Sequence, residues 1–131
     1  MSKLVHQRKQ KTNAQLHGQI GELAAASHLS KKGYKIIEQN VKVGYGELDI
    51  ITTHQDTTVF IEVKTRYTHE FGSPEEAITP WKMHTLLRSI AWYMLSHEEL
   101  PQLLRLDLVV VEVDEFETID RIEHIENISP Q

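Results

Sequence analysis

Three residues in the middle of the chain have the types and spacing needed for phosphodiester chemistry. Asp49 lies in the alternating segment 47–52, and Glu62 and Lys64 stand two residues apart in the segment 59–66. Paired carboxylates bind hard divalent cations such as Mg²⁺ through their oxygens. A lysine beside them can orient an attacking water or stabilise charge on a phosphate. These residues predict a metal site for phosphodiester hydrolysis, provided that folding brings them together.

The two segments are expected to form a β-hairpin, because short polar residues separate them. Side chains alternate along a strand, so Glu62 and Lys64 share one face of theirs. On the preceding strand, alternation puts Glu47, Asp49 and Ile51 on one face and Leu48 and Ile50 on the other.

The length of the hairpin loop decides whether the acids meet. If Thr53 pairs with Thr58, Asp49 stands opposite Glu62, and a two-residue loop gives the same pairing. An odd-length loop would put the acids on opposite faces. Directly opposed like charges in a sheet cost up to about 1 kcal/mol, so the pair calls for a cation. Mg²⁺ or Mn²⁺ is expected there, with the Val63 carbonyl as a further ligand. A solvated Glu-Lys pair is the ordinary alternative for an isolated Glu-x-Lys.

The remaining segments predict the elements that hold this hairpin. A helix is expected over 13–32, capped by Asn13, with Leu16, Ile20, Leu23 and Ser27 at helical spacing. A first strand is expected from residue 34 through 43. Ser-Pro-Glu-Glu at 73–76 and Thr-Pro at 79–80 both mark helix starts, with the main helix after Pro80. Residues 103–113 suit a central strand, and 119–128 fit either a strand or a short helix. This order predicts an α/β fold with a mixed sheet flanked by helices.

Composition limits the class of protein. The 131 residues fit one domain, here 13–131 after a flexible basic tail over 1–12. The chain has no cysteine and no long apolar run, which predicts a cytoplasmic protein without a membrane partner. Net charge is −5, but residues 1–66 carry ten basic and six acidic residues, against four and thirteen over 67–131. The basic half is therefore the candidate surface for nucleic acid, although ordinary surface scatter plus a flexible basic tail explains the counts equally well.

Several short segments together resemble the bacterial YraN family over nearly the whole chain. They are Gly-Glu at 21–22, Gly-Glu-Leu-Asp-Ile-Ile at 46–51, the strand 59–66, Phe-Gly-Ser-Pro at 71–74 and Arg-Leu-Asp at 105–107. That family is similar to the archaeal Holliday-junction resolvases of the PD-(D/E)xK nuclease superfamily. The resemblance implies a restriction-endonuclease-like fold, with Asp49 and Glu62 as metal ligands, Lys64 as the catalytic lysine and Glu22 as an additional acid from the first helix. Junction resolvases act as dimers, so a homodimer is one expectation.

Other residues are weaker candidates. Lys42, Arg66 and Lys82 are expected to contact phosphates, although solvated surface charge explains each equally well. Lys42 stands where family members often carry Arg, and it lacks the bidentate geometry of Arg. Arg105 and Asp107 fit a buried structural pair. Trp81, Trp92 and Tyr93 are expected to pack within helices rather than stack on bases.

The sequence as a whole predicts a metal-dependent endonuclease acting on DNA, including branched or structured DNA. Asp49, Glu62 and Glu22 hold the metal in this prediction, and Lys64 assists water attack. Two alternatives remain open: a nucleic-acid-binding module that keeps the nuclease fold without turnover, and a purely structural protein with surface acids.

Overall fold

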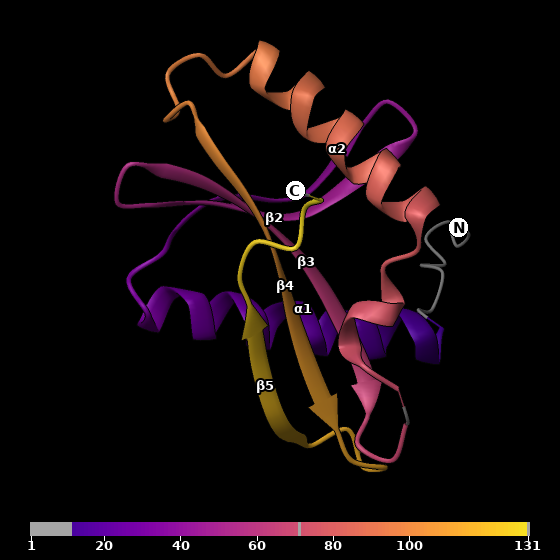
Figure 1. Ribbon diagram of the computed structural model, residues 1–131. Coiled ribbons are helices and arrows are strands. Elements are labelled where there is room, and N and C mark those ends of the chain that lie inside the picture. The colour runs from indigo at the N-terminus through magenta and orange to yellow at the C-terminus, as the bar shows by residue number, and fades with distance from the viewer. Residues whose placement is uncertain (1–11, 71, 131) are drawn as a thin grey trace, which may run out of the picture.

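The computed structural model describes residues 12–70 and 72–130, which form one five-stranded sheet with a helix on each face (Figure 1). The predicted basic tail lies almost entirely outside the described residues. The elements follow the chain as α1 (Asn13–Lys31), β1 (Lys35–Val43), β2 (Gly46–His54), β3 (Thr57–Tyr67), η1 (Pro74–Ala77), α2 (Pro80–Leu95), β4 (Leu103–Val113) and β5 (Ile119–Ile125).

Spatial order in the sheet equals chain order, β1-β2-β3-β4-β5. β3 and β4 run parallel, joined by the crossover through α2, and the other neighbouring strands pair antiparallel. The ambiguous last segment forms the edge strand β5. This topology confirms the predicted α/β fold, with a mixed central sheet flanked by helices.

Two apolar layers hold the helices on the sheet. On the α1 side, Ala25 and Leu29 pack against Ile61, Val109 and neighbouring strand residues. On the α2 side, Leu86 and Ile90 pack against Phe60, Leu106 and others. Because β3 and β4 contribute to both layers, they form the buried centre of the sheet, as the largely apolar segment 103–113 predicts.

The buried face of α1 differs from the predicted one. Leu16 and Leu23 are exposed, whereas Gly21, Ala25 and Leu29 are buried against the sheet. A β-carbon on Gly21 would overlap the Thr65 hydroxyl, so the helix backbone lies directly on β3. Small residues permit this close approach, but they carry little of the hydropathy that the prediction relied on.

The α1 cap also differs by one residue from the prediction. Thr12, rather than Asn13, caps the helix: its hydroxyl accepts from the Gln15 N–H at 3.1 Å, and Gln15 bonds back to the Thr12 N–H at 2.8 Å. This reciprocal pair is a capping box. The helix start is therefore fixed one residue earlier, which leaves the position of Glu22 within the helix unchanged.

A buried polar network lies on the α1 side of β4. Asp107 is fully buried and accepts bonds from Arg105 Nε at 2.9 Å, His124 Nε2 at 2.7 Å and the Asn127 N–H at 2.9 Å. Burial alone would raise the pKa of Asp107, but these hydrogen bonds outweigh it and lower the pKa. The predicted buried pair of Arg105 and Asp107 is confirmed, and His124 extends it across to β5.

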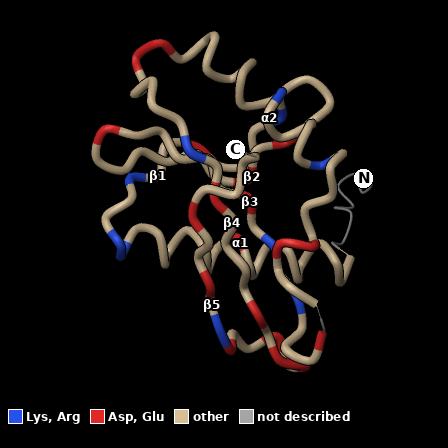
Figure 2. Tube along the Cα trace, in the orientation of Figure 1, with Lys and Arg blue, Asp and Glu red and all other residues tan. Residues whose placement is uncertain are grey.

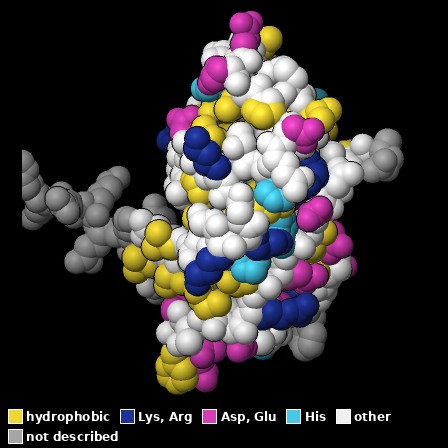
Figure 3. All heavy atoms as spheres, turned by 90° about the vertical axis from the view of Figure 1, so that its left-hand side faces the viewer, with side chains coloured by type: hydrophobic (Ala, Val, Ile, Leu, Met, Phe, Trp, Pro, Cys, Tyr) yellow, Lys and Arg dark blue, Asp and Glu magenta, His cyan; other side chains and the backbone are white. Residues whose placement is uncertain are grey.

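Charge is distributed unevenly along this frame. Acidic residues gather around the turn between β4 and β5 at one end of the molecule (Figure 2). Lysine, arginine and histidine side chains form a band across the middle of the face shown in Figure 3. The acidic turn agrees with the excess of acidic residues over 67–131. Among the described residues, no helix is long and apolar enough to cross a membrane.

Candidate metal centre

The hairpin of β2 and β3 has the register on which the acid pair depends. Thr53 pairs with Thr58 and His54 with Thr57, leaving the two-residue loop at 55–56. The ladder continues to the pair Ile50–Ile61 and ends there. Asp49 and Glu62 are thus the next residues along the two strands, at the point where the backbone pairing stops.

Asp49 bridges the two strands beyond the end of the ladder. Its Oδ2 accepts a hydrogen bond from the Val63 N–H at 2.9 Å, in place of a backbone carbonyl of β2. The pKa of Asp49 is raised because burial outweighs the stabilising bond from Val63. The Val63 N–H already bonds to Oδ2. The other oxygen, Oδ1, is therefore the better candidate to bind a cation. A ligand role for the Val63 carbonyl stays a prediction.

The strict alternation predicted for β2 is wrong at this position. Leu48 and Ile51 belong to the same apolar layer, on the α2 side, whereas Ile50 belongs to the layer on the α1 side. Residues three positions apart, such as Leu48 and Ile51, would lie on opposite faces of a regularly alternating strand. The break in alternation coincides with the end of the β2–β3 ladder, while β2 stays paired with β1 as far as Gly46, and the Asp49 carboxylate contacts β3.

Glu62 is the most perturbed acid of the site. It is only 8% exposed, and its Oε1 is a buried oxygen with no hydrogen-bond partner. Burial, followed by the charge of Asp49, raises its pKa to about 7. Its Oε2 lies 3.2 Å from Lys82 Nζ on α2. Glu62 therefore has one oxygen paired with a cation of the protein and one unpaired oxygen, at a position where a positive charge is favoured.

Glu22 approaches the pair from α1. The pKa of its half-buried carboxyl is raised, first by burial and then by the charge of Asp49, while a hydrogen bond with Asn40 opposes the shift. The helix thus brings a third acid within electrostatic range of Asp49. Within the ranges 12–70 and 72–130, however, no three acidic or histidine side chains converge tightly enough to form a ready metal cluster.

The lysine and the predicted phosphate contacts have different surroundings. Lys64 follows Glu62 by two residues on β3 and is exposed. Arg66 donates from Nε and Nη2 to Glu112 Oε2 at 3.0 and 2.8 Å and from Nη1 to the Gly72 carbonyl, with its side chain 12% exposed. Arg66 is therefore engaged in a structural ion pair. Lys42 is exposed, and Lys82 pairs with Glu62 instead of standing apart from the acids.

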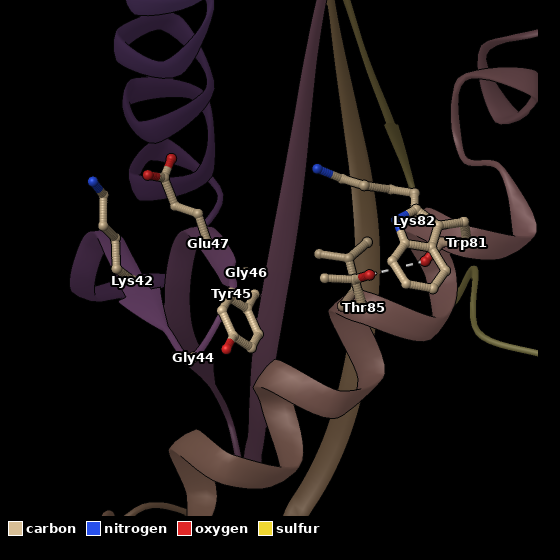
Figure 4. A pocket seen from close by; sticks show the side chains of 9 residues that line it. Lys42, Gly44, Tyr45, Gly46, Glu47, Trp81, Lys82 and Thr85 are labelled. Carbon is tan, nitrogen blue, oxygen red and sulfur yellow. Dashed lines mark hydrogen bonds between the residues drawn. The ribbon is translucent and has the colours of Figure 1, made fainter.

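Glu47 was not predicted as a site residue, and the contact of Lys82 with Glu62 was not predicted. Glu47 contributes to the raised pKa values of both Glu22 and Asp49. It lines a cavity of about 480 Å³ together with Lys42, Tyr45, Trp81 and Lys82 (Figure 4). The Gly-Tyr-Gly turn at 44–46 was the available signal, because it places an aromatic residue between two glycines.

Chemically, the site combines a buried glutamate, a partly buried aspartate and two lysines. Carboxylate oxygens suit Mg²⁺ or Mn²⁺, and the unpaired Glu62 oxygen fits such an ion. The fold defines an α/β protein whose acid pair lies at the end of the β2–β3 hairpin ladder. The model of the uncharacterised protein family UPF0102 matches residues 21–111, and the chain belongs to this family. The family assignment made from the sequence motifs is thereby confirmed.

Relatives and solved structures resemble the chain to different degrees. It is 43% identical to a UPF0102 protein of Syntrophomonas wolfei over 84% of this chain and 94% of that protein. It is 44% identical to one of Leifsonia xyli over 72% of this chain and 80% of that protein. Among solved structures, an fdxN element excision controlling factor of Anabaena variabilis is 17% identical, with a TM-score of 0.36 over 79% of this chain and 98% of that one.

Proposed function

We propose that this protein is a metal-dependent endonuclease that hydrolyses phosphodiester bonds of DNA, including branched or structured DNA. The observation that carries the proposal is the buried Glu62 oxygen without a partner, beside Asp49 at the end of the β2–β3 ladder. Burying two carboxylates costs stability unless a cation compensates them. Neighbouring carboxylates with raised pKa values are typical of a functional site.

The chain's own residues divide the work. Asp49 and Glu62 would hold Mg²⁺ or Mn²⁺, and Glu22 would add negative charge from α1. The ion would supply Lewis-acid stabilisation of charge on the phosphate. Lys64, exposed on β3, would orient the attacking water or hold a phosphate oxygen through its ammonium group.

The test is cleavage by the purified protein of branched, nicked and single-stranded DNA, and of RNA, with Mg²⁺ or Mn²⁺. Asp49→Ala and Glu62→Gln should each lower cleavage by about 10²-fold or more. Glu123→Gln, which alters a strand glutamate of β5 away from the site, should cleave as the wild type does. Cleavage that survives in Asp49→Ala, or its absence on every substrate with both metals, would refute the proposal.

One observation favours a second candidate, a nucleic-acid-binding module without turnover. Lys82 Nζ, at 3.2 Å from Glu62, supplies a positive charge where the metal would otherwise be required. This candidate predicts nucleic-acid binding that ignores chelators and Glu62→Gln. Calorimetry with Mg²⁺ separates the two, because the nuclease requires binding that disappears in Glu62→Gln.

A further inference from the structure

A groove runs between the β1–β2 turn and α2, next to the candidate metal centre. Two adjoining cavities of about 480 and 460 Å³ share the walls Gly44, Tyr45, Gly46, Trp81 and Thr85. The first extends to Lys42, Glu47 and Lys82, and the second to His84, Arg88 and Trp92. We call this surface the aromatic groove. Figure 4 shows Tyr45 on the turn and Trp81 on α2 as its two sides.

Three aromatic rings of the groove face solvent. Tyr45 is 106% exposed, Trp81 77% and Trp92 54%, although sequence reasoning expected the tryptophans to pack. Tyr93, in contrast, is buried, as expected. Large apolar rings that gather at one exposed place mark binding sites more often than scattered surface residues do. The groove therefore offers ring faces that the fold itself does not use.

The turn that carries Tyr45 is fixed on the helix. A β-carbon on Gly46 would overlap the Ser89 hydroxyl and would stand 3.1 Å from the Thr85 methyl carbon. Ser89 also donates to the Val43 carbonyl at 3.4 Å. Gly44 has φ +60°, a conformation that glycine adopts without strain. The spacing between Tyr45 and Trp81 is thus set by rigid elements, which favours a preformed site.

The charges of the groove suit a polyanion with flat rings. Lys42, Lys82 and Arg88 line it together with His84, against a single acid, Glu47, in a protein whose net charge is −5. Cations along a groove attract phosphates, and aromatic rings stack on bases of any sequence. Lys82 also connects the groove to the metal centre, since its Nζ lies 3.2 Å from Glu62.

We propose that the aromatic groove binds unpaired nucleotides, with bases stacked on Tyr45, Trp81 and Trp92 and phosphates held by the lining cations. This inference rests on the proposed function: the substrate class becomes DNA that presents an unpaired segment beside the phosphodiester to be cut. Bases paired inside a duplex present only their edges, so they cannot stack on these rings.

Intrinsic fluorescence reports directly on this groove, because the chain has two tryptophans, Trp81 and Trp92, and both line it. A short oligothymidylate, titrated into the wild-type protein in EDTA, should quench tryptophan emission. A blunt duplex of equal length should bind at least about tenfold more weakly. Chelation separates this measurement from cleavage.

Anisotropy with a labelled oligothymidylate then tests the rings one by one. Trp81→Leu should weaken binding about tenfold and Trp81→Phe much less, because phenylalanine retains a ring that stacks. Phe116→Leu, which alters a 78% exposed ring in the β4–β5 turn, should bind as the wild type does. Matching thermal unfolding curves confirm that all variants fold.

Each outcome bears on one proposal. Three results would each overturn the groove proposal, even if Glu62→Gln abolishes cleavage. Oligothymidylate could bind without changing tryptophan emission, Trp81→Leu could bind it like the wild type, or the duplex could bind as tightly as oligothymidylate. If oligothymidylate quenches tryptophan emission and Trp81→Leu weakens this quenching, but the protein cleaves no substrate, the groove proposal is supported and the nuclease proposal is refuted.

Discussion

Two buried carboxylates on adjacent strands, Glu62 on β3 and Asp107 on β4, have opposite electrostatics. Asp107 is 0% exposed and accepts bonds from Arg105, His124 and the Asn127 N–H, which together lower its pKa. Glu62 is 8% exposed, retains an oxygen without a partner and has a pKa raised to about 7. Burial alone therefore does not distinguish structural acids from functional ones. The number of donors around each carboxylate does.

The largest expected effect comes from removing Asp107, the carboxylate whose hydrogen bonds are satisfied. Asp107→Ala leaves Arg105 and His124 without their acceptor, so the free energy of unfolding should fall by about 3 to 5 kcal/mol. Urea unfolding measures it. Asp56→Ala, at the exposed β2–β3 turn, should change the free energy by less than about 0.5 kcal/mol. A change in Asp107→Ala as small as that would show that the network is dispensable.

The next prediction concerns Glu62 and has the opposite sign. Because its folded pKa of about 7 lies above the ordinary value of 4.5, the folded state binds this proton more tightly than the unfolded chain does. Its contribution to stability is thus lost as pH rises from about 4.5 through 7. Glu62→Gln should stabilise the protein by roughly 1 to 3 kcal/mol at pH 8 and by much less at pH 4.5. An equal gain at both pH values would contradict this account.

In the wild type, a bound cation should stabilise the folded protein at high pH, as Glu62→Gln is expected to do. At pH 8, Mg²⁺ at ten times its dissociation constant should raise the free energy of unfolding by about 1.4 kcal/mol. Thermal unfolding measures the shift, which should be absent in Glu62→Gln and present in Glu123→Gln. If Glu62→Gln responds to Mg²⁺ like the wild type, the ion binds elsewhere.

The smallest effect concerns Lys82, which pairs with Glu62 but is half exposed. Removing an exposed partner of an ion pair costs about 1 kcal/mol or less. In Lys82→Met the competing ammonium is gone, so Mg²⁺ should bind a few-fold more tightly at pH 8.5, where Glu62 is ionised. Calorimetry measures the affinity. Weaker binding in this variant would mean that Lys82 organises the site instead of competing for it.

The hairpin was predictable because its information is local. The spacing between Thr53 and Thr58 fixes the register of the hairpin, which brings Asp49 and Glu62 to the same end of the ladder. Helix starts at Ser73 and Thr79 were equally readable from their caps. The apolar run of β4 gave the bounds of that strand, since its residues fill both faces of the sheet.

What sequence reasoning missed depends on contacts between distant segments. The buried face of α1 runs through Gly21 and Ala25, whose small side chains show little periodicity of hydropathy. The break in β2 at Asp49 requires the ladder to end, and the pair Lys82–Glu62 requires α2 to lie over β3. The exposure of Trp81 and Trp92 follows from which face of α2 is turned to the sheet. Each of these is set by packing.

The contact between Gly21 and Thr65 fixes the height of α1 above the sheet. A larger residue at position 21 would overlap the Thr65 side chain, so we expect the helix to lift and to carry Glu22, the next residue, outward. The reach of that acid toward Asp49 is thus determined by a clearance smaller than a methyl group, at a neighbour with no charge of its own. Gly21→Ala would act on the acid site as a spacer, altering its electrostatics while every ionisable residue stays in the chain.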